Sequence, residues 1–401
     1  MTRKSLLPLL ILMVLFSPLA IDIFLPALPV MAQDLSVSLV TMGWSVTIFL
    51  LSLGLGQLIS GPLADRYGRK PVALGGVVVY GLSSALIIFA SNIELVLAAR
   101  LLQGFGACAI VVAAFACVRD RYDAIQSGVM YSYLNGAICC IPALAPLLGN
   151  LLTEYFGWRS NFQFMAGYAI FAGLIIAFSL TETQSEKTPN KSRLINVTTY
   201  FSILKHPVFL FNALVVMLAM AIIIAYVTTA PGWLMVNLQL ARSEFVFWFS
   251  LNAVFNVAAS LLAPKALLKW GPRISIGLGM LVLIVSGLLM MALMQWHHPA
   301  GFMIPIILSS IGFSLVMGAC AGQALAPFGD KAGTASALLG FIQMTGASII
   351  VGLLQSTDLN AVWQLIILML SILPIYCLYK MPSIKTKITF NDNVIGHNEV
   401  L

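Results

Sequence analysis

The sequence predicts an all-α membrane protein with twelve transmembrane helices, and three observations support this fold class. Of the 401 residues, 60% are hydrophobic and only 9% are charged, whereas about 25% are charged in a typical soluble domain. Apolar stretches of about 20 residues, long enough to cross a bilayer as a helix, recur along the whole chain. Most basic residues fall in alternate loops between these stretches. The composition excludes a soluble enzyme, a nucleic-acid-binding module and a disordered regulator.

Twelve apolar segments are expected to cross the membrane. They cover residues 5–29, 41–63, 72–90, 94–117, 128–152, 161–180, 207–229, 245–265, 274–295, 302–325, 333–354 and 362–380. The first segment has no small-residue cleavage pattern, so we interpret it as a membrane helix and not as a signal peptide. The polar stretch 181–205 predicts a cytoplasmic linker between an N-terminal six-helix bundle (1–180) and a C-terminal one (206–381). Residues 382–401 are expected to form a cytoplasmic tail.

The basic residues predict which side of the membrane each loop occupies. With the N-terminus inside, 18 of the 21 Lys and Arg fall on the cytoplasmic side, Arg159 and Arg242 fall outside, and Arg100 lies within a span. An excess of Lys and Arg in cytoplasmic loops is the usual signal of orientation. Both termini are therefore expected in the cytoplasm, and the net charge of +7 is explained by insertion and not by a nucleic-acid partner.

Two short basic turns suggest an internal duplication. Gly68 follows Arg66 and precedes Arg69, and Gly271 lies between Lys269 and Arg273. The two glycines are 203 residues apart, half the chain length. Glycine permits a tight reversal with positive φ, and duplicated halves are a common construction of membrane transporters.

The segment from Gly61 to Lys70 has the pattern Gly-x-Leu-Ala-Asp-Arg-x-Gly-Arg-Lys. This pattern resembles the signature of the major facilitator superfamily between helices two and three. The resemblance implies two pseudo-symmetric six-helix bundles, and a loop that holds the cytoplasmic ends of the halves together and releases when the protein faces inward. The residues of this cytoplasmic gate motif are Gly61, Asp65, Arg66, Gly68, Arg69 and Lys70. A loop that served insertion alone would need only the basic residues.

Asp22 and Arg100 are the charges that lie well inside predicted spans. Arg100 begins a segment that resembles the second motif of the superfamily, and a buried Arg costs at least about 2.5 kcal/mol unless it has a partner or a wet cavity. Asp22 lies at a similar depth and is the expected partner. Burial disfavours a charged carboxyl and a nearby Arg favours it. We therefore expect Asp22 and Arg100 to couple transport to protons; the alternative is a fixed structural ion pair.

The fifth span resembles one subgroup of the superfamily, the Bcr/CflA-type drug exporters. Its sequence contains Pro142, Pro146 and Gly149, although Ala145 replaces the Gly that precedes Pro in the usual motif. The segment from Asp22 to Pro29 supports the same resemblance.

Polar and aromatic residues within the spans are candidates for a substrate cavity, since a mostly apolar pocket with a few polar groups suits amphipathic molecules. These candidates are Trp44, Gln57, Tyr133, Asn135, Tyr226, Trp248, Asn252, Asn256, Gln323 and Gln343. For each of them taken alone, helix packing or an interhelical hydrogen bond is favoured over substrate contact.

The resemblance implies a proton-coupled exporter of drugs or related amphipathic molecules that works by alternating access in the bacterial inner membrane. The alternatives are export of an endogenous metabolite, such as a siderophore, and proton-coupled import of a nutrient. We expect no enzymatic activity, no cofactor other than the coupling proton, no metal site and no nucleic-acid partner. The chain has no nucleotide-binding P-loop pattern. The expected partners are a small-molecule substrate and the lipid bilayer, with the chain as a monomer.

Overall fold

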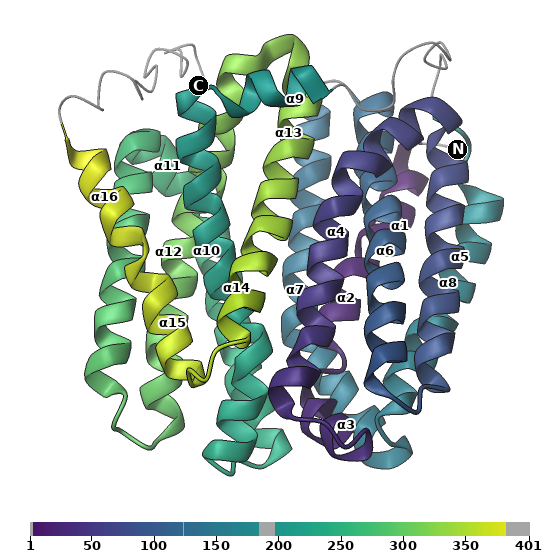
Figure 1. Ribbon diagram of the computed structural model, residues 1–401. Coiled ribbons are helices and arrows are strands. Elements are labelled where there is room, and N and C mark those ends of the chain that lie inside the picture. Colours follow the sequence, from purple (N-terminus) through teal and green to yellow (C-terminus); the bar gives the residue numbers. More distant parts are fainter. Residues whose placement is uncertain (1–2, 123, 184–196, 382–401) are drawn as a thin grey trace.

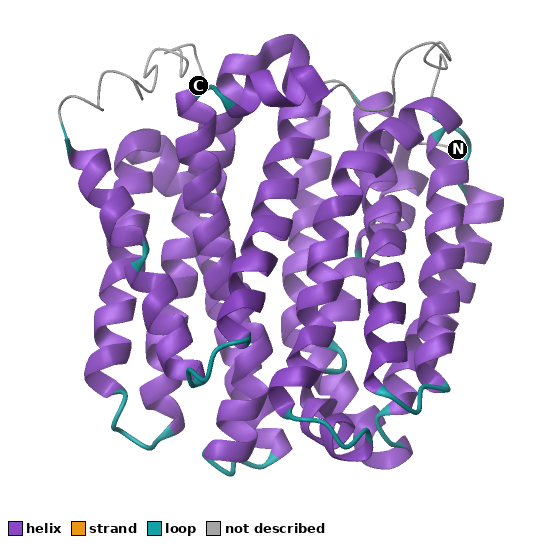
Figure 2. Cartoon of the chain, in the orientation of Figure 1, coloured by secondary structure: helices purple, strands orange, loops and turns teal. Residues whose placement is uncertain are grey.

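The computed structural model describes residues 3–122, 124–183 and 197–381, and all regular structure within them is helical (Figure 2). The first half contains α1 (Arg3–Val14), α2 (Phe16–Asp22), η1 (Leu25–Ala27), α3 (Leu28–Asp34), α4 (Leu39–Tyr67), α5 (Arg69–Ile88), α6 (Ile93–Arg121), α7 (Ala124–Phe156) and α8 (Arg159–Ser179). The second half contains α9 (Val197–Leu204), α10 (Pro207–Pro231), η2 (Gly232–Asn237), α11 (Arg242–Leu293), α12 (Pro299–Leu325), η3 (Ala326–Lys331), α13 (Ala332–Phe341), η4 (Ile342–Gly346), α14 (Ala347–Gln355), α15 (Ala361–Leu370) and α16 (Ile372–Lys380).

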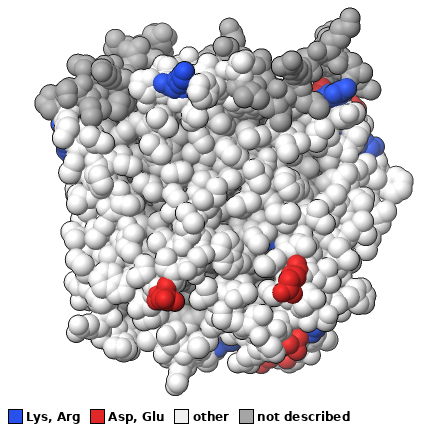
Figure 3. Space-filling view, viewed as in Figure 1, with Lys and Arg blue, Asp and Glu red and all other residues white. Residues whose placement is uncertain are grey.

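The helices form two groups that lie side by side (Figure 1). Helix α1 begins and helix α16 ends on the upper side of this view, which we call the termini side. Short loops join the helices on the opposite side, near α3. Figure 3 shows a broad face with few charged side chains between these two sides, as expected for a surface in contact with lipid.

Eleven helices in the described residues are long and apolar enough to cross a membrane. One of them, α11, is 52 residues long and contains a non-helical residue, Gly271, with φ 75° and ψ 166°. Two predicted spans, 245–265 and 274–295, lie on either side of this residue. Counted as two crossings, α11 brings the total to the predicted twelve, and the protein is a multi-pass membrane protein.

Gly271 and Gly68 adopt similar backbone conformations. Gly68, between α4 and α5, has φ 104° and ψ 159°. Both glycines thus join consecutive spans through a reversal that requires positive φ. The predicted use of glycine in the two turns is confirmed, and the repeat is one of backbone shape as well as of sequence.

The first span is broken into short helices by its proline residues. Pro26 lies in η1 and Pro29 in the first turn of α3. A proline supplies no backbone N–H, and its ring crowds the preceding turn, so closely spaced prolines favour a break in the helix here. The break begins directly after Asp22, the last residue of α2.

The two halves meet where α4 packs against α13, η4 and α14, and where α7 packs against α11. Thr345 in η4 donates a hydrogen bond from Oγ1 to the carbonyl oxygen of Leu51 (3.2 Å). Nearer the opposite side, Thr47 Oγ1 donates to Gln355 Oε1 (3.0 Å). A Cβ added at Gly54 would lie 2.6 Å from the backbone nitrogen of Thr345. The contact between α4 and η4 therefore requires glycine at position 54.

Gly54→Ala is expected to weaken this contact, because overpacking a tight interface typically costs about 1–3 kcal/mol. Thermal unfolding of the purified chain should occur at a lower temperature in the variant. The matched control is Gly75→Ala in α5, where an added Cβ meets no atom within 4 Å and Ala favours the helix. An unchanged unfolding temperature for Gly54→Ala would contradict the tight approach of α4 to η4.

Candidate functional site

Asp22 lies at the break in the first span and is buried, with 4% of its surface exposed. Among the residues that the structure describes, none forms a hydrogen bond or an ion pair with its carboxylate. Helix α2 and the η1 segment both pack against α7. Asp22 is therefore enclosed by protein without a polar partner in this conformation.

The helix-five motif supports the backbone next to Asp22. A Cβ added at Gly149 would lie 2.7 Å from the carbonyl carbon of Ile23, the residue that follows Asp22. Because only glycine permits this approach, α7 can pack directly on the backbone where the first span breaks. Pro142 and Pro146 lie in the same helix. Of the three motif residues, Gly149 is the one that positions the Asp22 segment.

Arg100 in α6 is fully buried. Its Nε donates a hydrogen bond to the carbonyl oxygen of Ser45 (3.0 Å), and its Nη1 donates to Oε1 of Gln103. The guanidinium also lies over the rings of Phe24 (4.7 Å) and Phe49 (4.3 Å). Carbonyl, amide and aromatic groups thus surround the guanidinium, and cation–π contacts of this kind strengthen when water is excluded.

The expected contact between Asp22 and Arg100 is not formed in this conformation. The ion pairs between described residues do not include it. Phe24, two residues after Asp22, occupies the position beside the guanidinium. The segment therefore presents Phe24 and not Asp22 to Arg100. Whether the two charges act together in proton coupling stays a prediction.

Several buried polar atoms near Arg100 lack a hydrogen-bond partner among the described residues. They are Arg100 Nη2, Ser45 Oγ and Tyr80 Oη. Tyr80 interacts electrostatically with Arg100. An unsatisfied buried polar group typically costs about 1–3 kcal/mol. A conformational change that gave these three atoms hydrogen-bond partners would therefore lower the local free energy. Such unsatisfied groups are expected where a segment of the protein adopts more than one conformation.

Polar residues of the second half face the Asp22 segment. Tyr226 in α10 is buried, and Asp22 acts on it electrostatically across the boundary between the halves. Asn252 in α11 lies beside Tyr226 and accepts a hydrogen bond from Ser310 Oγ (3.0 Å). The η1 segment contacts both α10 and α11. The structure thus brings together Asp22 from the first half and two of the cavity candidates, Tyr226 and Asn252, from the second.

The other cavity candidates are more dispersed. Trp44 and Gln57 in α4 lie against Gly352 and Gly340 of the second half. The remaining candidates are placed as follows: Tyr133 and Asn135 are exposed on α7, and Trp248, Asn256, Gln323 and Gln343 are half-buried on α11, α12 and η4. Trp44 and Gln57 therefore belong to the boundary between the halves, as Tyr226 and Asn252 do, and the role of the whole set as a cavity stays a prediction.

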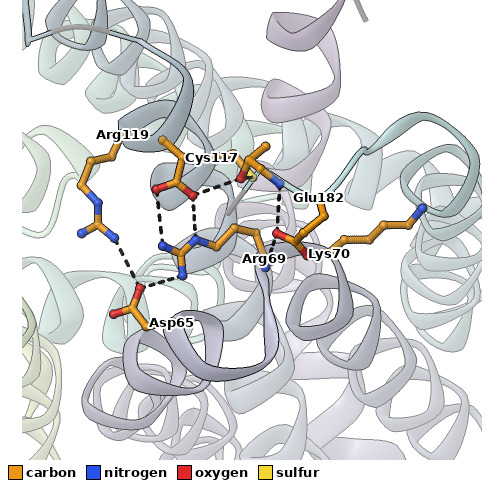
Figure 4. A network of polar contacts seen from close by, with 8 residues as sticks. Asp65, Arg69, Lys70, Cys117, Arg119 and Glu182 are labelled. Atoms are coloured by element: carbon orange, nitrogen blue, oxygen red, sulfur yellow. Dashed lines mark hydrogen bonds and ion pairs between the residues drawn. The ribbon is translucent and has the colours of Figure 1, made fainter. Parts of the chain in front are cut away.

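The gate motif forms an ionic network on the termini side (Figure 4). Arg69, only 4% exposed, pairs through Nη1 with Asp65 Oδ1 (2.6 Å) and through Nε with Asp120 Oδ2 (2.8 Å). Arg119 Nη2 lies 3.5 Å from the same Asp65 oxygen. One buried guanidinium thus links the end of α4 to the end of α6, and charge-assisted bonds of this kind are the strongest that proteins form.

Glu182, which follows α8, completes the network. Its carboxylate accepts hydrogen bonds from the backbone N–H groups of Arg69 (2.9 Å) and Lys70 (3.2 Å), the first residues of α5. These N–H groups have no partner within the helix, and the helix N-terminus is partly positive. Gly68 makes room, since a Cβ there would lie 2.9 Å from Glu182 Cδ. Positive φ and close approach both require glycine at position 68.

Two further hydrogen bonds join the network to α8 and to Thr183, the residue after Glu182. Lys70 Nζ donates to the carbonyl oxygen of Ala177 in the last turns of α8 (2.7 Å), and Thr183 Oγ1 donates to Asp120 Oδ2 (3.1 Å). Of the other motif residues, Arg66 lies over the ring of Tyr67, and Gly61 has no neighbour within 4 Å of an added Cβ. The sequence indicated Asp65, Gly68, Arg69 and Lys70 but not Asp120 or Glu182.

The contacts described for this network join α4, α5, α6 and the end of α8, which all belong to the first half. Toward the second half, Arg119 Nη1 lies 3.9 Å from a Cβ added at Gly333, near the start of α13. The implied role of the loop in holding the two halves together stays a prediction.

Comparison with known proteins accounts for this architecture. A sequence profile described as the Major Facilitator Superfamily matches residues 10–351. The chain belongs to the Major Facilitator Superfamily. A protein named multidrug resistance protein MdtL from Citrobacter koseri is 33% identical over 354 residues, which cover 88% of this chain and 89% of that protein. Its namesake from Salmonella dublin is 31% identical over 402 residues, which cover 97% and 96%.

Solved structures of the superfamily share the fold. A D-xylose-proton symporter superposes with a TM-score of 0.78 at 14% identity, over 94% of this chain and 97% of that chain. The human organic anion transporter MFSD10 (TETRAN) gives 0.69 at 16% identity, over 95% and 100%. At these low sequence identities, the two superpositions show a shared fold and nothing about substrate. The predicted superfamily and its transporter architecture are confirmed.

In this superfamily member the first half is also tied together on the opposite side. Arg159 Nη1 pairs with Asp34 Oδ2 (2.8 Å), and Trp158 Nε1 donates to the same oxygen (3.0 Å). Arg159 Nη2 donates to the carbonyl oxygen of Ala90, just beyond α5 (3.1 Å). The first half is therefore fastened at both ends of its helices by ionic contacts.

Gly149→Ala is expected to disturb the Asp22 segment, because the added Cβ meets the backbone of Ile23, which cannot rotate away. Transport should fall by at least tenfold, the effect of about 1.4 kcal/mol on the barrier. Gly136→Ala in the same helix adds a Cβ with no atom within 4 Å and should transport like the parent. Equal transport by the two variants would contradict a positioning role for Gly149.

Glu182→Gln is expected to destabilise the start of α5, since the neutral amide is a weaker acceptor for the two N–H groups. The loss should be about 0.5–2 kcal/mol, as for other helix caps, measured by denaturant unfolding of the purified chain. Glu154→Gln changes an exposed carboxyl near the end of α7 on the opposite side and is not expected to lower stability. A loss as large in the Glu154 variant would show that the effect is not specific to the network.

Proposed function

We propose that this chain is a proton-coupled exporter of drugs or related amphipathic small molecules. The proposal is supported by its similarity to proteins named multidrug resistance protein MdtL and by the position of Asp22. The single observation on which it depends most is a buried, unpartnered carboxyl at the boundary between the two halves. We further propose that the chain acts as a monomer in the bacterial inner membrane, with the termini side in the cytoplasm, because the basic residues are concentrated there.

The contacts between the halves suggest how the site at Asp22 could be exposed first to one side of the membrane and then to the other. On the opposite side the halves are in contact, since α3 packs against η2 and Thr47 is bonded to Gln355. In the proposed cycle, opening of these contacts lets Asp22 take a proton from outside while the drug leaves. When the protein faces inward, the proton departs and a new substrate binds.

The local chemistry supports antiport. A carboxylate enclosed by protein without a hydrogen bond carries an uncompensated charge, and a bound proton removes that charge. A cationic or strongly polar substrate near Tyr226 and Asn252 would interact with the same carboxylate. Proton and substrate thus compete for one group, and the membrane potential contributes about 2.3 kcal/mol per charge per 100 mV to the exchange.

Asp22→Asn is expected to abolish substrate-driven proton flux in proteoliposomes, because the amide cannot exchange a proton. Cells that produce this variant should lose the protection given by the parent chain against a panel of toxic compounds. Asp34→Asn, which alters an acid that is already ion-paired on the opposite side, is the matched control and should keep proton flux.

Proton flux retained by Asp22→Asn would overturn the assignment of this residue. If the parent chain protected against none of a chemically diverse panel, export of an endogenous metabolite or import of a nutrient would replace drug export as the function.

A further inference from the structure

The turn at Gly271 repeats the shape of the turn at Gly68 but has lost its ionic network. With the offset of 203 residues that relates the two glycines, Asp65 corresponds to Leu268 and Arg69 to Pro272. The acid and the buried guanidinium of the first half are therefore both absent from the second. Basic residues persist at the two other positions, where Lys269 corresponds to Arg66 and Arg273 to Lys70.

Four exposed cations gather around this turn. Lys265 and Lys269 lie one helical turn apart in α11, just before Gly271, and Arg273 follows it. Helix α16 brings the fourth, Lys380, because Tyr379 Oη donates a hydrogen bond to the carbonyl oxygen of Arg273 (2.6 Å). We call Lys265, Lys269, Arg273 and Lys380 the basic rim. Within the part of the chain that the structure describes, no carboxylate lies within ion-pair distance of any of them.

Exposed apolar side chains border the basic rim. Leu261, Leu268 and Ile274 expose 67%, 75% and 57% of their surfaces, and Trp270 exposes 42%. On a membrane protein such residues face acyl chains, and Trp is enriched at the level of the headgroups. The molecule thus presents positive charge at headgroup depth directly next to surface that contacts lipid tails.

Insertion topology alone does not account for this arrangement. At the equivalent turn of the first half, the buried Arg69 pairs with Asp65 and Asp120 in the folded protein. Among the described residues, no carboxylate pairs with a cation of the basic rim, and Lys380 lies over the ring of Tyr376 (5.4 Å). Clusters of Lys and Arg at this depth attract anionic lipids, and basic pockets between helices bind their headgroups.

We propose that the basic rim binds the phosphate headgroup of an anionic phospholipid, whose acyl chains lie against Leu261, Leu268 and Ile274. A free phosphate could engage the cations but would gain nothing from the apolar residues. The occupant is therefore a lipid, held where α16 meets the turn between the two spans of α11. The bound lipid replaces the protein carboxylates that tie the corresponding turn of the first half.

The test is binding of phosphatidylglycerol to the purified full chain, measured by native mass spectrometry and by the rise in unfolding temperature that the lipid causes. Each cation near the surface should contribute about fivefold in affinity. The triple variant K265Q/K269Q/R273Q should therefore bind about a hundredfold more weakly. The charge-preserving variant K265R/K269R/R273K should bind like the parent, and so should Arg242→Gln on the opposite side.

Thermal unfolding in phosphatidylcholine alone shows whether the triple variant is folded. If the triple variant does not fold, the single variant Lys269→Gln replaces it, with an expected loss of about fivefold in affinity for phosphatidylglycerol. Equal binding of phosphatidylglycerol by the parent and the folded variant would overturn the proposal. Equal binding of phosphatidylcholine by the parent would do the same, as would displacement of the lipid by inorganic phosphate at matched concentration. None of these measurements depends on transport.

Discussion

The first half encloses two guanidinium groups, those of Arg69 and Arg100, and it stabilises them away from water in two different ways. On the termini side, Arg69 is buried between two carboxylates. In the interior, Arg100 pairs with no carboxylate of the described residues and is held by a carbonyl, an amide and two aromatic rings. The first arrangement satisfies the guanidinium with strong paired charges. The second leaves Nη2 unsatisfied and so leaves Arg100 with more to gain from a change of surroundings.

The two halves of the molecule also differ in how many of their charged side chains form ion pairs. The four ion pairs formed between described residues all lie in the first half, at both ends of its helices. The second half repeats the glycine turn but not the acids. A half fastened at both ends is expected to move as a rigid body, and the second half contains π-helical segments at η2 and η4. Short π-helical segments of this kind are frequent at functional sites.

The sequence was sufficient to predict the fold, the number of crossings and the turn residues, because these depend on hydropathy, charge and the conformational freedom of glycine. It could not predict which way side chains point around a broken helix. Asp22 and Arg100 are expected at similar depth along their spans, but at the break that follows Asp22 it is Phe24 that lies beside the guanidinium. Glu182 was missed for a related reason. It caps a helix that begins 113 residues earlier in the chain, and no local pattern marks such a distant partner.

The contacts between the halves are of a kind that can break and re-form. Across the boundary between α4 and η4–α14, hydroxyl groups donate to an amide and a carbonyl, and α7 receives one more such bond from Ser250. Each is worth about 0.5–1.5 kcal/mol net, whereas loss of one partner from a buried ion pair costs about 3–5 kcal/mol. At this boundary Gly54 lets the backbones of α4 and η4 approach closely, and the side chains of Trp44 and Gln57 pack against glycines of the second half. The polar contacts between the halves therefore cost less to break than the ion pairs within the first half, and this difference favours a movement of one half against the other over disruption of the first half.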